Sequence, residues 1–245
     1  MAAERPAPRL YVDADLTAGN EIVLSPAQSH YLGAVMRRGA GDGLRLFNGR
    51  HGEWQAEITA LKRKIGAARP VTRTRPQTTE PDLWLLFAPV KRAPVDLMAC
   101  MATELGVSAL WPVITHNTVA RRVKLERLRA NAMEAAEQCG RLSLPEVFEP
   151  APLDKVLDQW PGDRRLLLCD ESGGGTPLAG ALNGAEPGPW AVIIGPEGGF
   201  APDEAEALAA LPGALRAGLG PRILRAETAV AAALACWQAL VGDWR

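Results

Sequence analysis

The stretches VIIGPEGGF (residues 192–200) and GLGPRILRAETAV (residues 218–230) decide how the C-terminal part of this chain folds. Each contains a short apolar run typical of a buried strand, which stops at Gly-Pro and leads toward a helical pattern. In open α/β sheets, ligands bind beyond the carboxyl ends of the strands, where glycine lets the backbone approach closely. Two such strand ends close together in the sequence therefore predict one pocket between them.

The same alternation of strand and helix extends back to about residue 81. Further strands are predicted in DLWLLFAPV, SALWPVI, PEVFEP, RRLLLCD and ALRAGLG. Helices are predicted over residues 95–105, 123–139, 152–160, 202–211 and 226–241, the first two stopped by Gly106 and Gly140. Apolar strands that alternate with helices predict an α/β domain with a mostly parallel sheet covered on both faces.

The first 75 residues follow a different pattern. RLYV and EIVL are strand-like, Ser25-Pro26 predicts a helix start, and GLRLFNG with EWQAEITAL forms an alternating pair joined through NGRHG, which is a hairpin signal. RPVTRT offers one more strand, so we expect a small β-rich module of barrel type. The proline-containing stretch RPQTTEP (residues 75–81) marks the boundary, which gives expected domains at 1–75 and 76–245.

Composition excludes several classes of protein. The chain has 245 residues, of which 47% are hydrophobic and 22% charged, a balance typical of a soluble globular protein. Its apolar runs are too short to cross a bilayer and its N-terminus is charged, so we expect a cytoplasmic protein without a membrane partner. The four cysteines and three histidines show no metal-ligand spacing, so no metal is expected.

The formal net charge of −1 hides an asymmetry. Residues 1–75 carry twelve Lys or Arg and seven Asp or Glu, whereas the remainder carries fifteen and twenty-one. A basic N-terminal part and an acidic C-terminal part indicate that the first binds phosphates while the second has a different function.

The pocket between the two Gly-Pro stops does not have the spacing of a phosphate cradle. The chain contains neither G-x-G-x-x-G at this place nor a G-x-x-x-x-G-K-[ST] motif, and Glu197 would repel a pyrophosphate. A Gly-Pro stop taken alone is most often only a turn. An acidic, glycine-rich pocket with apolar neighbours suits a ligand with an aromatic base, a sugar and a positive centre, and S-adenosylmethionine has all three. The apolar neighbours are Ile193, Ile194, Leu219, Ile223 and Leu224.

Taken together, IGPEGGF, LGPRILRAETA, TELGV (103–107), EQCGR (137–141) and the N-terminal RLYV…HYLGAVMRRGAGDGLRLFNG closely resemble the bacterial ribosomal RNA small-subunit methyltransferase E family. The resemblance covers nearly the whole chain. It implies S-adenosylmethionine-dependent methylation of N3 of a specific uridine in the 16S rRNA of the 30S subunit. It also implies the SPOUT superfamily: an N-terminal PUA-like RNA-binding barrel, a C-terminal α/β domain with a trefoil knot, and a homodimer in which the two knots meet.

The resemblance also implies which residues hold the methyl donor. Carried over by position, they come from three knot loops and the start of the last helix. They are Leu168, Cys169, Asp170, Ile194, Gly195, Pro196, Glu197, Gly198, Gly199, Leu219, Gly220, Ile223, Leu224 and Thr228. One departure is Met101, which stands where the family usually has a lysine; if that lysine positions RNA, the contact is either lost here or replaced by Arg92 or Arg121.

Methylation at N3 of uridine requires loss of the N3 proton and stabilisation of negative charge on the base. Arg225 and Glu227, just beyond the second Gly-Pro stop, are the predicted catalytic residues. Alternative roles are a surface ion pair for Arg225 and a favourable helix-dipole charge for Glu227, with water or a residue of another chain as the base.

In the N-terminal module, His30 and Arg37 are seven residues apart, which is two helical turns and predicts one shared face. With Arg38, and with Arg9 at the start of the first strand, they are the predicted RNA contacts. Two alternatives to the rRNA uridine enzyme stay open: a methyltransferase of the same fold acting on another RNA, and a non-catalytic RNA-binding protein of ribosome assembly.

Overall fold

The computed structural model describes residues 7–90, 92–120, 122–170 and 174–245. The chain divides into two compact units, described separately below: Met1–Thr79 with Ala136–Ser143, and Glu80–Ala135 with Leu144–Arg245. The domain boundary expected after residue 75 stays a prediction. Arg121 and the side chain of Arg92, the expected substitutes for the family lysine, lie outside the described residues. Met101 is half-buried.

The N-terminal unit is built on a five-stranded sheet in the order β1-β3-β4-β5-β2. Its elements are β1 (Arg9–Tyr11), β2 (Ile22–Leu24), α1 (Pro26–His30), η1 (Tyr31–Val35), β3 (Gly43–Phe47), β4 (Glu53–Lys62) and β5 (Ile65–Arg75). β1 pairs with β3 in parallel and the other neighbours are antiparallel. The predicted β3–β4 hairpin is confirmed, and in its turn the Asn48 side chain accepts hydrogen bonds from the backbone N–H groups of Arg50 and His51.

The helix of this unit begins as predicted but ends differently. Ser25 caps α1 through a capping box with Gln28, and Pro26 occupies the first turn. After His30 the chain continues as the π-helix η1, and Arg37 then adopts a left-handed backbone conformation with φ of 52°. The expectation that His30 and Arg37 share one helical face is therefore wrong, because a π-helix holds more residues per turn than an α-helix and Arg37 lies outside both helices.

The interior of the N-terminal unit combines an apolar cluster with a buried carboxylate. The side chain of Glu53 is 1% exposed and contacts Arg9 at 2.7 Å, Arg45 at 3.2 Å and Arg75 at 3.9 Å. Burial alone raises the pKa of Glu53, but the hydrogen bond from Arg9 and the charges of the three arginines outweigh it, so the pKa lies below that of an ordinary glutamate.

Arg9 uses its remaining donors on the C-terminal end of α3 (Leu125–Cys139). Its guanidinium donates to the carbonyl oxygens of Ala136, Glu137 and Arg141 at 2.7, 2.9 and 2.9 Å. A cation placed on the last carbonyls of a helix is stabilised by the helix dipole. Arg9 therefore supports the packing of the N-terminal unit, and its predicted RNA contact stays untested.

The C-terminal unit contains a larger sheet in the order β11-β13-β10-β12-β6-β7-β8, with β9 paired to β7. The strands are β6 (Leu83–Phe87), β7 (Ala109–Ile114), β8 (Glu146–Val147), β9 (Ala151–Pro152), β10 (Arg165–Cys169), β11 (Thr176–Pro177), β12 (Trp190–Ile194) and β13 (Leu215–Gly218). All the pairings are parallel, which confirms the predicted parallel sheet.

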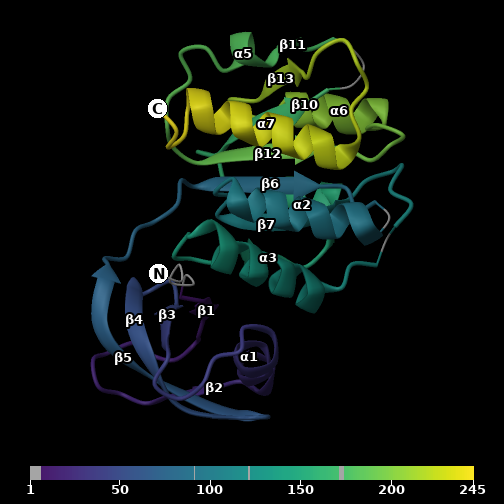
Figure 1. Cartoon of the computed structure of the whole chain (residues 1–245). Helices are drawn as coiled ribbons and strands as arrows, with labels where there is room; N and C mark the ends of the chain where they lie inside the picture. Colours follow the sequence, from purple (N-terminus) through teal and green to yellow (C-terminus); the bar gives the residue numbers. More distant parts are fainter. Residues whose placement is uncertain (1–6, 91, 121, 171–173) are drawn as a thin grey trace. The chain divides into compact units, whose positions relative to one another are not determined.

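Helices cover both faces of this sheet. They are α2 (Arg92–Glu104), α3, α4 (Leu153–Asp158), α5 (Leu178–Ala181), α6 (Pro202–Ala209) and α7 (Ala226–Leu240). One apolar cluster joins the strands to α2, α3, α5 and α7, and a second joins their opposite face to α4 and α6. Figure 1 shows α2 and α7 side by side on the first face. Gly106 and Gly140, with φ of 79° and 89°, follow α2 and α3 as predicted.

The fold agrees with the sequence pattern for every long element, and the structure adds the short elements β9, β11 and α5. Within the described residues, no helix has the length and apolar character needed to cross a membrane. The same residues contain no cluster of three or more His, Cys, Asp or Glu side chains suited to a metal ion. The trefoil knot and the closure of the N-terminal sheet into a barrel stay predictions.

Candidate functional site

A pocket of about 760 Å³ lies at the carboxyl ends of β10, β12 and β13. These strands are neighbours in the sheet, so the residues that follow them meet at one edge. The volume falls within the range of sites for small molecules and cofactors. The pocket is therefore where the two Gly-Pro stops of the sequence predicted it.

Twelve predicted residues line this pocket, including both predicted catalytic residues. They are Cys169, Asp170, Ile194, Gly195, Pro196, Glu197, Leu219, Gly220, Ile223, Leu224, Arg225 and Glu227. Arg225 is the N-cap residue of α7, and Glu227 lies in the first turn of that helix. The helix start thus presents a cation and a carboxylate to the same space.

Four residues predicted to hold the methyl donor do not line the pocket: Leu168, Gly198, Gly199 and Thr228. Leu168 packs in the cluster on the opposite face of the sheet, because successive residues of a strand point to opposite faces and Cys169 takes the pocket side. Thr228 is an exposed residue of α7.

Gly198 and Gly199 shape the loop after β12 rather than the pocket wall. Their carbonyl oxygens both accept hydrogen bonds from the Asn117 side chain, each at 3.0 Å. The sequence analysis missed Asn117. No sequence signal pointed to it, because it lies 81 positions from Gly198 and only the fold brings the two together.

The pocket wall depends on one close backbone approach that the sequence analysis also missed. A Cβ placed on Gly175 would lie 2.7 Å from both the carbonyl carbon of Ala217 and the nitrogen of Gly218. These atoms belong to β13 and cannot move away as a flexible side chain would. Gly175 is therefore the residue that lets the loop after β10 lie directly against β13.

Gly195 permits a second close approach, here to an aromatic ring. A Cβ on Gly195 would lie 2.9 Å from the ring of Phe200. Like Gly175, Gly195 permits a packing distance that a residue with a Cβ would not allow.

The charged groups of the pocket have defined neighbours. The Nε atom of Arg216 donates to the carboxylate of Asp170 at 2.7 Å, and the backbone N–H of Asp170 donates to Ala217. The Asp170 side chain is 11% exposed, so this ion pair is screened less than one in open water. Glu197 is exposed at the pocket wall.

Cys169 lines the pocket, but its thiol is unreactive at neutral pH. Burial, and secondarily the neighbouring Cys236, raise the pKa of the Cys169 thiol to about 12. The thiol is therefore protonated at neutral pH and does not provide a nucleophile.

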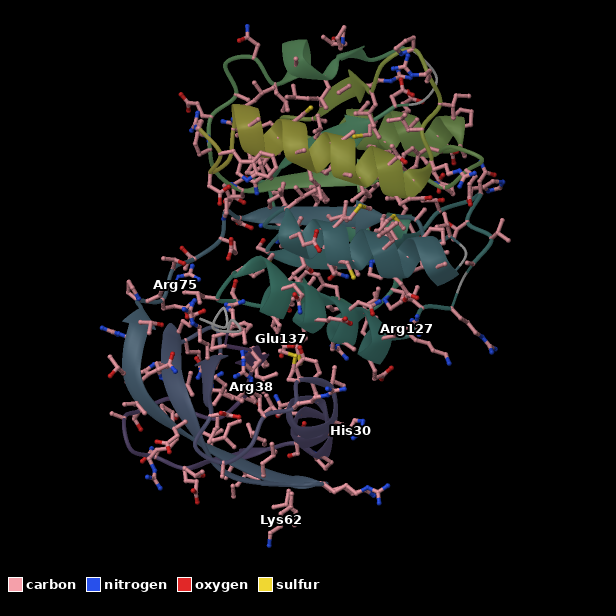
Figure 2. All side chains as sticks on the ribbon, in the orientation of Figure 1. His30, Arg38, Lys62, Arg75, Arg127 and Glu137 are labelled. Carbon is pink, nitrogen blue, oxygen red and sulfur yellow. The ribbon has the colours of Figure 1, made fainter. Side chains whose placement is uncertain are left out.

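The four predicted RNA contacts separate in the structure. His30 and Arg38 line a smaller pocket in the N-terminal unit (labelled in Figure 2), Arg37 is exposed nearby in the chain, and Arg9 is 12% exposed in the cluster around Glu53. The sequence analysis did not select Lys62 and Arg63, which line the same small pocket as His30 and Arg38.

Two known families match two different parts of this chain. A family described as RNA methyltransferase domain matches residues 78–238, and a family described as RNA methyltransferase PUA domain matches residues 24–69. The first match covers the C-terminal pocket and the second covers most of the N-terminal sheet.

Individual relatives extend over almost the entire chain. Ribosomal RNA small subunit methyltransferase E of Rickettsia conorii is 33% identical, with 93% of each chain covered. The protein of the same name from Synechocystis is also 33% identical over 95% of this chain and 78% of its own. The crystal structure of ribosomal RNA small subunit methyltransferase E from Neisseria gonorrhoeae, bound to S-adenosylmethionine, has a TM-score of 0.84 and 28% identity, covering 98% of this chain and all of its own.

The N-terminal match confirms the predicted PUA-like domain, and the Neisseria structure shares the α/β methyltransferase architecture. Two relatives are more than 30% identical to this chain over more than three quarters of their own lengths, and this similarity assigns the family. This chain belongs to the ribosomal RNA small subunit methyltransferase E family.

Proposed function

We propose that this protein transfers the methyl group of S-adenosylmethionine to N3 of a specific uridine in 16S rRNA. Family membership supports the reaction class, and the methyl donor bound to the Neisseria relative supports the choice of cofactor. The observation that carries the proposal is the pocket at the ends of β10, β12 and β13, with Arg225 and Glu227 on its lining.

The lining of this pocket fits S-adenosylmethionine. Ile194, Leu219 and Leu224 offer an apolar surface for the adenine ring, while the carboxylates of Asp170 and Glu197 suit the ribose hydroxyls and the positive charges of the ligand. Gly175 and Gly195 belong to the lining and let the pocket walls pack closely against β13 and Phe200. When bound, the cofactor supplies an electrophilic methyl group.

The reaction forms a bond between uridine N3 and the methyl carbon, breaks the bond between that carbon and sulfur, and releases the N3 proton. Arg225, which lines the pocket, is the candidate donor to the negative charge that develops on the uracil oxygens. Glu227, two residues further in the first turn of α7, is the candidate acceptor of the N3 proton.

Calorimetric titration with S-adenosylmethionine is the first test. Binding heat is expected for an enzyme of this kind, whereas its absence would leave the non-catalytic RNA-binding protein as the better assignment.

The second test is primer extension on 16S rRNA from cells with and without the gene. A methyl group on N3 occupies the Watson–Crick edge and stops reverse transcriptase, so the stop is expected to disappear in the deletion strain and to return with the wild-type gene. An unchanged stop in the deletion strain would refute the 16S assignment and favour another RNA substrate.

The remaining expectations from the family resemblance belong to this proposal. They are a trefoil knot in the C-terminal unit, a homodimer, the 30S subunit as partner and a cytoplasmic location. Sedimentation equilibrium tests the dimer, because a single species of monomer mass would exclude it.

A further inference from the structure

The smaller pocket of the N-terminal unit has a volume of about 260 Å³. One wall comes from α1 and η1, with His30 and Gly33, and the other comes from the end of β4 and its turn, with Leu61, Lys62 and Arg63. Arg38 completes the lining. In Figure 2 the label of His30 lies beside α1, and that of Lys62 lies near the far end of the β4–β5 hairpin.

This hollow results from close packing of the helix on the hairpin. A Cβ on Gly66 of β5 would lie 2.7 Å from the Ser29 hydroxyl oxygen, so only glycine lets α1 come this close. The Ser29 hydroxyl itself donates to the carbonyl of Ser25 and is buried. The space on the other side of the contact is open at Gly33, where a Cβ would meet only the Leu61 side chain, at 3.7 Å.

The π-helix brings Arg38 to the pocket. Because Arg37 adopts the left-handed conformation, the backbone N–H of Arg38 turns back to the carbonyl of Leu32 at 2.9 Å. A non-glycine residue in this conformation and a π-helix both cost backbone energy and are frequent at functional sites. Here they place Arg38 on the lining, and Arg37 off it.

The lining combines positive charge with an apolar surface. Arg38, Lys62 and Arg63 are cationic, His30 adds an imidazole, and no acidic residue belongs to the lining. Among the described residues, none of the ion pairs found involves His30, Lys62 or Arg63.

Two large apolar side chains are exposed on the elements that form the pocket. They are Val35 of η1, 61% exposed, and Ile65 at the start of β5, 67% exposed. Neither lines the pocket, whose own apolar wall comes from Gly33, Ala34 and Leu61. A hollow that has both cations and an apolar wall suits a phosphate and a base together, which a flat basic surface for duplex phosphates would not require.

We propose that this pocket holds one unpaired nucleotide of the RNA substrate. Its phosphate lies against Arg38, Lys62 and Arg63, and its base lies against the wall formed by Gly33 and Leu61. The assignment rests on the proposed function, because it takes RNA as the substrate. It extends the RNA contacts expected from the sequence to Lys62 and Arg63, and it restricts them to single-stranded RNA.

The decisive variant is Gly33→Leu, which fills the hollow and leaves every charge in place. Gly33 lies within a helix and has no positive φ, so a side chain is compatible with its backbone. The probe is a short fluorescently labelled single-stranded RNA, measured without cofactor, and Gly33→Ala is the fold control because its methyl group fits beside Leu61. We expect Gly33→Leu to weaken RNA binding about tenfold, the loss corresponding to one base contact, while the salt dependence stays the same.

The charge test compares neighbouring cations of one turn. Lys62→Ala with Arg63→Ala is expected to lower the slope of log affinity against log salt by about 1.4, since each contact with single-stranded RNA contributes about 0.7. Lys64→Ala is the matched control, because Lys64 is exposed in the same turn but does not line the pocket. For Lys64→Ala, the slope of log affinity against log salt is expected to change by less than half as much as for the double variant.

Two results would overturn the inference: unchanged RNA affinity in Gly33→Leu, or a slope change in Lys64→Ala as large as the share of about 0.7 expected for each cation of the double variant. A duplex of the same sequence that competes as well as the single strand would also contradict it. Methyl transfer and cofactor binding are measured separately on the wild-type protein. If the wild-type protein shows neither methyl transfer nor cofactor binding while the RNA results are as expected, the proposed function is rejected and the RNA pocket is supported. If it shows both while the RNA results differ from those expected, only the RNA pocket is rejected.

Discussion

The two pockets of this protein are built in different ways. The large pocket of the C-terminal unit is lined mainly by glycine, proline and apolar residues that follow parallel strands, and two glycines allow its walls to pack closely. The small pocket of the N-terminal unit is lined by cationic side chains on a helix and a hairpin. On the proposed roles, binding in the first pocket should depend on its shape, whereas binding in the second should depend on salt.

The same contrast extends to the interiors of the units. In the C-terminal unit both faces of the sheet are covered by apolar clusters. The N-terminal unit adds a buried carboxylate, Glu53, surrounded by Arg9, Arg45 and Arg75. Four predictions test how far this contrast holds, from the largest expected effect to the smallest.

Glu53→Gln should have the largest effect, on the stability of the N-terminal unit. Removing one partner of a buried ion pair costs about 3–5 kcal/mol. Because the pKa of Glu53 lies below the ordinary value, its contribution is present above the pKa of an unfolded glutamate and is lost as pH falls through the folded pKa. The measurement is hydrogen exchange of the β4 amides, in which the difference between wild type and variant should shrink in acid.

Glu57→Gln is the control for this change, since Glu57 lies exposed on the same strand. Its effect should stay within about 0.5 kcal/mol. Equal destabilisation by both variants would show that the ion pairs between Glu53 and the surrounding arginines do not contribute specifically to stability.

Arg225→Ala should lower turnover roughly a hundred- to a thousandfold, the loss typical of one donor to a developing negative charge. Affinity for S-adenosylmethionine should change little, because the proposed contact forms with the uridine. The assay combines single-turnover methyl transfer with calorimetry. Near-normal product yield from Arg225→Ala would reject its catalytic role, and an equal loss in Arg222→Ala, which also lines the pocket, would assign the effect to general positive charge.

Gly175→Ala should weaken binding of S-adenosylmethionine. The added methyl group meets backbone atoms of β13 at 2.7 Å, and overpacking of this kind costs about 1–3 kcal/mol, which corresponds to roughly five- to 150-fold in affinity if the bound state bears the cost. Gly180→Ala is the matched control, since a Cβ there meets only the Thr176 methyl group, at 3.4 Å. Calorimetry that finds equal affinities for the two variants would contradict the proposed role of Gly175.

The smallest effect concerns the cysteines. With its pKa raised to about 12, Cys169 should resist alkylation at neutral and mildly alkaline pH, whereas the exposed Cys139 should react. Mass spectrometry of peptides after brief treatment with iodoacetamide distinguishes the two sites. Rapid labelling of Cys169 would show that the end of β10 becomes accessible to solvent through the pocket.

The sequence predicted the long elements and the place of the large pocket because both depend on local signals, whereas the residues that hold the methyl donor came from the family resemblance. Apolar periodicity identified strands and helices, and glycine after a strand identified the places where a ligand approaches the backbone. Twelve of the sixteen residues assigned to cofactor or catalysis line one pocket. Leu168 was the informative exception, because the side of a strand that faces a ligand depends on register with the rest of the sheet.

The remaining features depend on contacts between distant segments. Gly175 acts through β13, Asn117 holds a loop far along the chain, and Arg9 binds the end of α3. The π-helix before Arg38 replaced a regular helix, so counting helical turns grouped Arg37 with His30, whereas Arg38 and the distant Lys62 line the pocket with His30. No local pattern encodes any of these contacts.

The most direct test of the central claim is a crossed titration of Gly175→Ala and Gly33→Leu with S-adenosylmethionine and with single-stranded RNA. The account predicts that Gly175→Ala loses affinity only for the cofactor and that Gly33→Leu loses affinity only for RNA. If either variant loses both affinities while remaining folded, the two pockets do not have separate ligands and the account is wrong.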